Sequence, residues 1–176
     1  MKDWRVAVAA VVATIGIIGA AQAITDTAFR YSTPQVGFFS INPMAMTADS
    51  STVVYDRGPS SISHDVGGGG CFGTGVNLPQ GARMATLAVW FTSDNQDDPT
   101  FTIERQRHSD GDLVTVAAVT GVDDSQTRKL ATVTIESDVG TIDNSSYSYA
   151  FRFCPGSFVD SFRSARIRYF YRNAGD

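Results

Sequence analysis

Alternation of apolar and polar residues with a period of two is the feature of this sequence that most constrains its fold. Residues 84–92 carry the pattern clearly. Successive side chains of a β-strand point to opposite faces of a sheet, so the pattern predicts a strand with one buried face. After residue 23, no stretch keeps the i, i+3, i+4 spacing of an amphipathic helix over three turns. The side chains predicted to face inward are Ala85, Leu87, Val89 and Phe91, and those predicted to face outward are Met84, Thr86, Ala88, Trp90 and Thr92.

Further strands are predicted from the same alternation, or from runs rich in Val, Ile, Thr and Phe between Gly, Pro, Asp and Ser. They are residues 36–41, 52–55, 71–76, 101–107, 113–120, 130–136, 147–153 and 165–172. Eight or nine short strands predict an all-β protein. The fold class expected is an antiparallel β-sandwich, with a jelly roll among the topologies that such strands allow.

Two connecting segments have distinctive compositions. Residues 47–70 are rich in Ser and Gly and offer little to bury, so we expect them to be the least ordered part of the domain. Residues 78–81 read Leu-Pro-Gln-Gly, which places Pro79 and Gly81 at the second and fourth positions of a type I turn.

Residues 1–23 have the three-part layout of a secretory signal peptide. Lys2 and Arg5 precede the uncharged apolar run 6–20, and a small-x-small site ends at Ala23. The run is short of the roughly 20 apolar residues that span a bilayer, so a membrane anchor is less favoured. We expect a secreted protein, extracellular, periplasmic or on the cell surface, with no membrane span after cleavage. Residues 24–35 would form an N-terminal arm or an edge strand, and residues 36–176 a single domain.

The charge balance argues against a general nucleic-acid binder. The 176-residue chain has a formal net charge of −4, and removal of residues 1–23 makes it −5. Nucleic-acid binding requires a basic surplus that displaces counterions from phosphates. Residues 152–176 nevertheless hold five arginines against two aspartates. We therefore expect a local basic surface formed by the C-terminal part of the chain.

The chain contains two cysteines, Cys71 and Cys154. An oxidising compartment lets two thiols pair, so a single disulfide is the simplest interpretation. Two buried free thiols or one reactive cysteine are the alternatives. No CxxC motif or Cys/His cluster indicates redox chemistry or zinc binding.

Trp90 is the strongest candidate for ligand binding, because the alternation places its ring on the outer face of its strand. Phe170 has the outer parity in its own strand. If these strands are neighbours, the outer face carries aromatic rings among basic side chains, which suits an acidic polysaccharide or another acidic surface partner. Burial of Trp90 under a loop, or pairing of the arginines with carboxylates, is the alternative. The arginines predicted to share this face are Arg152, Arg166, Arg168 and Arg172.

One loop has the composition of a weak calcium site. Asp94, Asp97 and Asp98 lie within five residues and are joined by two side-chain amides. Hard cations accept such oxygen ligands, although the EF-hand spacing is missing. Hydrophilic turn residues that only solvate the loop are the plainer interpretation. No other cofactor is indicated.

No catalytic constellation is recognisable. His64 lies in a Ser-His-Asp run, but neighbours on an extended chain point to opposite sides and cannot form a base relay. The nucleophile motif G-x-S-x-G is absent from the sequence. We expect His64 to be an exposed loop histidine and the protein to be non-enzymatic, with an acid-pair hydrolase as the least favoured function.

Three motifs resemble those of an uncharacterised family of secreted bacterial single-domain β-sandwich proteins. They are the VNLPQGA turn at residues 76–82, TIDN at 141–144 followed by YSY at 147–149, and the ARIRY strand at 165–169. The resemblance implies a secreted β-sandwich and transfers no catalytic residue. Two functions remain open: a module that binds carbohydrate or another surface ligand, and a structural or assembly subunit of a cell-surface or extracellular matrix layer.

Overall fold

The structure is a computed structural model that describes residues 29–65, 69–93, 97–122 and 127–174. The predicted signal peptide and residues 24–28 of the predicted arm lie outside the described residues. Residues 29–35, which the sequence left as arm or edge strand, belong to the first strand. No helix among the described residues is long and apolar enough to cross a bilayer.

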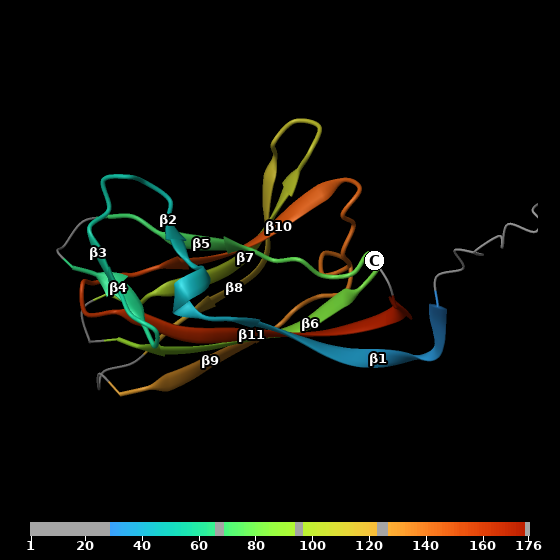
Figure 1. Ribbon diagram of the computed structural model, residues 1–176, viewed down its shortest axis with the longest axis horizontal. Helices are drawn as coiled ribbons and strands as arrows, with labels where there is room; N and C mark the ends of the chain where they lie inside the picture. The colour runs from blue at the N-terminus through green and yellow to red at the C-terminus, as the bar shows by residue number, and fades with distance from the viewer. Residues whose placement is uncertain (1–28, 66–68, 94–96, 123–126, 175–176) are drawn as a thin grey trace, which may run out of the picture.

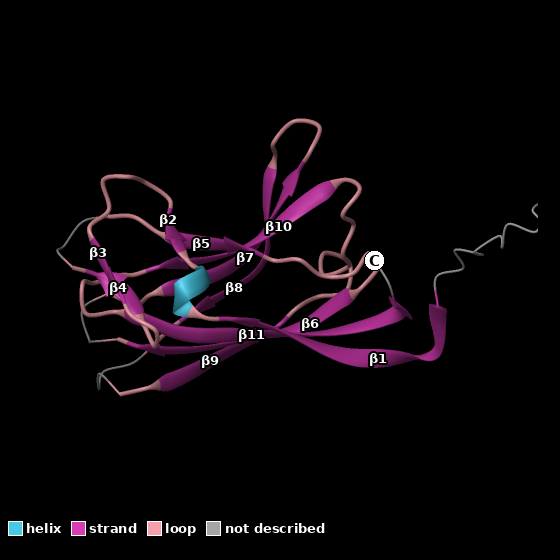
Figure 2. Ribbon diagram, viewed as in Figure 1, coloured by secondary structure: helices cyan, strands magenta, loops and turns pink. Residues whose placement is uncertain are grey.

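Two antiparallel sheets pack face to face, which confirms the predicted β-sandwich (Figure 2). The six-stranded sheet contains β1 (Phe29–Ile41), β3 (Tyr55–Arg57), β4 (Ile62–His64), β6 (Arg83–Thr92), β9 (Lys129–Thr134) and β11 (Ser161–Ala174). The five-stranded sheet contains β2 (Thr47–Ala48), β5 (Phe72–Gly75), β7 (Thr100–Arg107), β8 (Leu113–Thr120) and β10 (Tyr147–Cys154). A short 3-10 helix, η1 (Pro43–Ala45), follows β1.

β11 organises the six-stranded sheet, whose order is β3-β4-β11-β6-β9. One side of β11 pairs with β6 along most of its length. The other side pairs first with β4 and then with β1. Figure 1 shows β1 and β11 running together along one layer of the sandwich, with β5 and β10 in the opposite layer. In the five-stranded sheet the order is β2-β5-β10-β7-β8.

Aromatic side chains fill the space between the sheets. The rings of Phe72, Phe101 and Phe153 stack, with centroids 5.8 Å apart for Phe72–Phe153 and 5.3 Å apart for Phe101–Phe153. Phe162 from β11 packs against them from the opposite sheet, and all four side chains are fully buried. Burial of such rings supplies most of the apolar area that stabilises a domain of this size. Only the outward faces of the two sheets are left for binding.

The side chains of β10 and β11 alternate between the core and the surface, as the period-two pattern predicts. Tyr149, Phe151, Phe153, Ala165 and Ile167 are all buried.

In β6 the side chains that were predicted to face inward are buried from Leu87 onward. The expected outward position of Met84 is wrong, since its side chain is fully buried. The pairing of β6 with β11 shifts register between Arg168 and Tyr169, so that Met84 turns to the core and Arg83 to the outside.

The described part of the segment 47–70, residues 47–65 and 69–70, is more ordered than its composition suggested. It contributes β2, β3 and β4, and Ile62 is fully buried. The predicted exposed loop position of His64 is wrong, because β4 pairs with β11 and carries His64 into the sandwich at 7% exposure, with its ring centroid 5.3 Å from that of Phe72. The expected strand at 52–55 overlaps β3 only at Tyr55.

The turn before β6 starts one residue later than predicted, and it is of type II instead of type I. The amide of Ala82 donates to the carbonyl of Pro79, so the turn spans 79–82 and Gly81 occupies its third position. Gly81 has a φ of 73°, which is the left-handed value that a type II turn requires there. The consequence is that Gln80 sits at the exposed corner of the turn.

Cys71 and Cys154 form the predicted disulfide, with an S–S distance of 2.01 Å. Cys71 immediately precedes β5, and Cys154 is the last residue of β10. These strands are neighbours in the five-stranded sheet. The bond therefore fixes one end of that sheet and closes a chain segment of 83 residues.

Candidate functional site

The strands that carry Trp90 and the C-terminal arginines are neighbours. Trp90 on β6 pairs with Ser164 on β11 and with Leu130 on β9. Arg168 on β11 pairs with Thr86 on β6 and with Phe38 on β1. Directly paired residues of adjacent strands project from the same face of a sheet. β1, β6, β9 and β11 thus present their outward side chains on one surface. We use the name arginine–aromatic face for its members Phe38, Arg83, Trp90, Arg166, Arg168 and Phe170.

Arg166 lies between two rings of this face. The guanidinium carbon is 5.0 Å from the ring centroid of Phe38 and 5.6 Å from that of Trp90. Both distances are within the roughly 6 Å over which a cation is attracted to an aromatic ring. The planar guanidinium thereby holds side chains of β1 and β6 together across β11.

Phe170 forms a second cluster further along β11. The guanidinium of Arg168 is 4.9 Å from the Phe170 ring centroid, and that of Arg83 is 5.3 Å from it. Arg83 reaches this position because the bulge in β6 turns it outward and pairs it with Phe170. The face therefore carries two clusters of cationic and aromatic groups, one around Arg166 and one around Phe170.

The face is open to solvent. Phe38 is 55% exposed, and Leu130, the partner of Trp90 in β9, is also 55% exposed. Trp90 is half-buried, while Arg166 and Arg168 are exposed. The alternative of a fully buried Trp90 therefore does not hold. A cluster of exposed apolar groups on one sheet face is typical of a binding surface.

The arginines of this face are not neutralised by carboxylates. Within the part of the chain that the structure describes, Arg166 and Arg168 form no ion pair with Asp or Glu. The contacts that their guanidinium groups do make are with the rings of Phe38, Trp90 and Phe170. An approaching anion would therefore find donors that no resident carboxylate already occupies.

Arg152 belongs elsewhere, contrary to the grouping expected from the sequence. It lies on β10 in the five-stranded sheet, where Nη2 is 2.8 Å from Asp49 Oδ2 and Nη1 is 4.0 Å from Glu104 Oε1. The hydrogen bond from Arg152 lowers the pKa of the Asp49 carboxyl below its ordinary value. Arg152 is a paired arginine of the opposite sheet, and it has no part in the arginine–aromatic face.

The acidic loop is described only in part. Asp97 and Asp98 are exposed, and Asp94 lies outside the described residues. Among the described residues, no group of three or more His, Cys, Asp or Glu side chains is placed to hold a metal ion. The calcium interpretation therefore receives no support from the described geometry.

Two members of this surface were missed by the sequence reasoning. Phe38 has the outward parity in β1, and Arg83 stands at the start of β6. The period-two pattern around Phe38 was available as a signal, but nothing in the sequence indicates that β1 pairs with β11. Arg83 becomes part of the surface only through the bulge, which the sequence pattern does not reveal.

No protein-family model and no curated protein sequence matches this chain. Solved structures resemble its fold. One is the C-terminal CBM6 of LamC, a marine laminarinase from Zobellia galactanivorans, which is 11% identical over 74% of this chain and 98% of its own, with a TM-score of 0.50. The xylan-binding module CBM15 is 12% identical over 81% of this chain and 99% of its own, with a TM-score of 0.49. The likeness to the LamC module establishes a shared β-sandwich fold.

Proposed function

We propose that this protein is a secreted, non-enzymatic polysaccharide-binding protein whose binding surface is the arginine–aromatic face. The observation that carries the proposal is the juxtaposition of three aromatic rings with two arginines that have no carboxylate partner among the described residues, on an exposed face built by four strands. The fold likeness to a carbohydrate-binding module and the disulfide, which is typical of exported proteins, support it.

The chemistry of the face suits a sugar polymer. Aromatic rings offer a flat apolar surface on which the C–H face of a pyranose can stack, with little loss of side-chain entropy. Arginine provides forked donors that match a carboxylate or a sulfate. A face that combines both groups can hold the ring and the acidic substituent of the same sugar.

Arg166 favours an acidic sugar over a neutral one. Its guanidinium lies near both Phe38 and Trp90, so it partly covers the rings on which a sugar would stack. A neutral sugar would displace the cation and offer it only hydroxyl acceptors, which bind a guanidinium more weakly than a charged group does. An acidic sugar would draw the guanidinium to its own charge and expose the rings at the same time, which offsets the lost cation–ring attraction.

The proposal predicts that Trp90→Ala weakens polysaccharide binding strongly. Removal of a central aromatic anchor from a binding surface costs about 2 kcal/mol, which corresponds to roughly thirtyfold in Kd. The measurement is affinity electrophoresis through gels that contain alginate, a sulfated galactan or a neutral glucan. Phe158→Ala is the matched control, because Phe158 is 52% exposed but lies outside the face, in the turn before β11.

Arg166→Ala extends the same experiment to ligand charge. We expect it to weaken binding of the acidic polymers and to leave the neutral glucan unaffected or better bound. Arg152→Ala makes the same substitution on the opposite sheet and should change neither. Equal retardation of wild type and Trp90→Ala would contradict the proposal. Concentration-dependent assembly without any sugar, abolished by changes in the face, would instead support the assembly subunit.

A further inference from the structure

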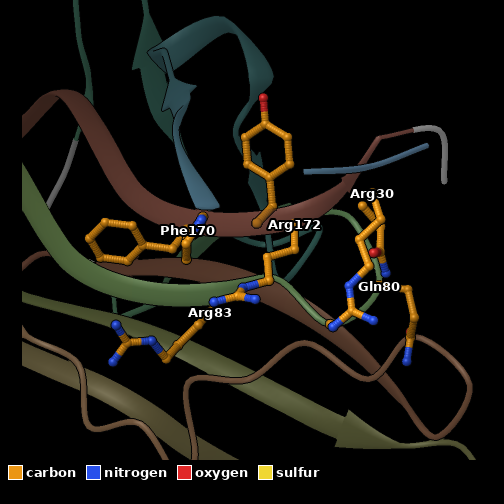
Figure 3. Close-up of a pocket in the computed structure, with 9 residues that line it drawn as sticks. Arg30, Gln80, Arg83, Phe170 and Arg172 are labelled. Carbon is orange, nitrogen blue, oxygen red and sulfur yellow. The ribbon is translucent and has the colours of Figure 1, made fainter. Parts of the chain in front are cut away.

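A pocket of about 690 Å³ opens at one end of the arginine–aromatic face. Its walls come from the start of β1, the turn at 79–82, the first residue of β6 and the last part of β11. In Figure 3 its polar side chains form a row, from Arg83 near Phe170 through Arg172 to Arg30 and Gln80. The volume lies in the range of roughly 300–1,000 Å³ that is usual for ligand sites.

The pocket concentrates positive charge. Arg30, Arg83 and Arg172 line it, and none of its nine lining residues is Asp or Glu. None of the three forms an ion pair with a carboxylate within residues 29–65, 69–93, 97–122 and 127–174. Three like charges in one concavity repel one another, on a chain whose net charge is negative. A bound anion would relieve that repulsion.

The neutral donor in this pocket is held in place by its neighbours. Gln80 Oε1 accepts a hydrogen bond from the amide of Asn144 at 2.7 Å, and Gln80 Nε2 donates to Asp143 Oδ1 at 3.4 Å. Asp143 is itself engaged by Ser145, whose hydroxyl donates to Oδ1 at 2.5 Å. The carboxylate of Asp143 therefore binds its own turn and Gln80, and it forms none of the ion pairs found among the described arginines.

The pocket is continuous with the arginine–aromatic face through Phe170. Phe170 lines the pocket and also lies under the guanidinium groups of Arg83 and Arg168. Trp90 and Arg83 are seven residues apart on β6, which corresponds to roughly 20 Å at about 3.3 Å per residue. A ligand that touches both is a polymer that runs along the strands, longer than one or two sugar rings.

We infer that this three-arginine pocket binds a carboxylate or sulfate group of an acidic polysaccharide that extends along the arginine–aromatic face. The inference rests on the proposed function and adds the position and the charge of a second subsite. The two sources of the anionic group, uronate and sulfate ester, share the negatively charged oxygens that three guanidinium groups recognise.

The test measures the Kd of wild type, Arg83→Ala and Arg172→Ala for alginate oligosaccharides, sulfated galactan oligosaccharides and a neutral glucan. We expect each arginine variant to bind one or both acidic ligands roughly tenfold more weakly, because a hydrogen bond to a charged group contributes about that factor. The acidic ligand that loses affinity identifies the anionic group. Arg107→Ala is the control, since Arg107 is an exposed arginine of the other sheet, paired with Asp110.

Two outcomes separate this inference from the proposed function. If acidic ligands bind in a Trp90-dependent manner but Arg83→Ala and Arg172→Ala match Arg107→Ala, the pocket assignment is overturned and the binding face stands. If no polysaccharide binds at all, the proposed function fails. The pocket is then tested separately, by NMR of the arginine Nε–Hε groups during titration with inorganic sulfate. Saturable shifts at Arg83 and Arg172 support an anion site, and unchanged signals overturn it.

Discussion

Arg166 sets the character of the candidate surface at the scale of single residues. Its guanidinium carbon lies 5.0 Å from the Phe38 ring centroid and 5.6 Å from that of Trp90, so one cation bridges the rings of two strands. An arginine beside a carboxylate would form an ion pair, as Arg152 does with Asp49 on the opposite sheet. The absence of a carboxylate partner among the described residues is what leaves Arg166 available to a ligand.

The carboxylate of Asp143 accepts hydrogen bonds from Ser145 and from Gln80, which lines the pocket. The contribution of these bonds to stability should therefore depend on pH. Hydrogen bonds, first of all from Ser145, lower the pKa of this carboxyl to about 2 from an ordinary value of 3.8. A carboxyl whose pKa is depressed by folding stabilises the native state above the unfolded pKa and loses that contribution as the pH falls through the folded one.

We predict that Asp143→Asn, which removes the charge and keeps an acceptor oxygen, lowers the melting temperature modestly above pH 4. The difference from wild type should shrink as the pH falls from about 4 toward 2. Thermal unfolding followed by circular dichroism at several pH values measures it. A difference that stays constant down to pH 2 would show that the charge of Asp143 does not contribute.

Residue positions could be predicted only as far as local pattern determines them. The alternation correctly predicted an outward Trp90 and an inward Leu87. It failed at Met84, where a bulge reverses the parity. The separate expectation of an exposed loop position for His64 failed because long-range pairing of β4 with β11 buries a residue of polar local sequence. Both failures come from contacts between segments far apart in the chain, which a local periodicity does not contain.

At the scale of elements, β11 brings the binding groups together. It pairs with β6 on one side and with β4 and β1 on the other. Period-two alternation indicates which face a side chain occupies, but it carries no information about which strand lies next to it. For this reason Arg166 and Arg168 could be predicted to face outward, while the contribution of Phe38 and the separation of Arg152 could not.

The disulfide joins the ends of β5 and β10 within the five-stranded sheet, away from the arginine–aromatic face. We predict that the double variant Cys71→Ser, Cys154→Ser loses roughly 4 kcal/mol of unfolding free energy, because the bond restricts a long loop in the unfolded chain. Urea denaturation measures the loss. Polysaccharide binding by the folded fraction should be unchanged, and a selective loss of binding would contradict the assignment of the site to the other sheet.

At the scale of the whole molecule, the two sheets divide the charged groups differently. The described ion pairs of Arg107 and Arg152 lie on the five-stranded sheet and its loops. On the six-stranded sheet, Arg166 and Arg168 instead lie beside aromatic rings, and Arg30, Arg83 and Arg172 line the pocket. One layer of the sandwich therefore carries a basic surface, although the net charge of the chain is negative. Binding there should weaken as salt screens these charges.

The central claim is that a polysaccharide binds against Trp90 on the arginine–aromatic face. Residues 24–176 contain Trp90 as their only tryptophan, so the emission of a chain that lacks residues 1–23 reports on this one ring. The most direct measurement is a fluorescence titration of that chain with alginate and sulfated galactan oligosaccharides. If a polysaccharide stacks on Trp90, we expect a saturable change in Trp90 emission whose midpoint matches the Kd from calorimetry. Binding detected by calorimetry with no change in Trp90 emission would contradict it.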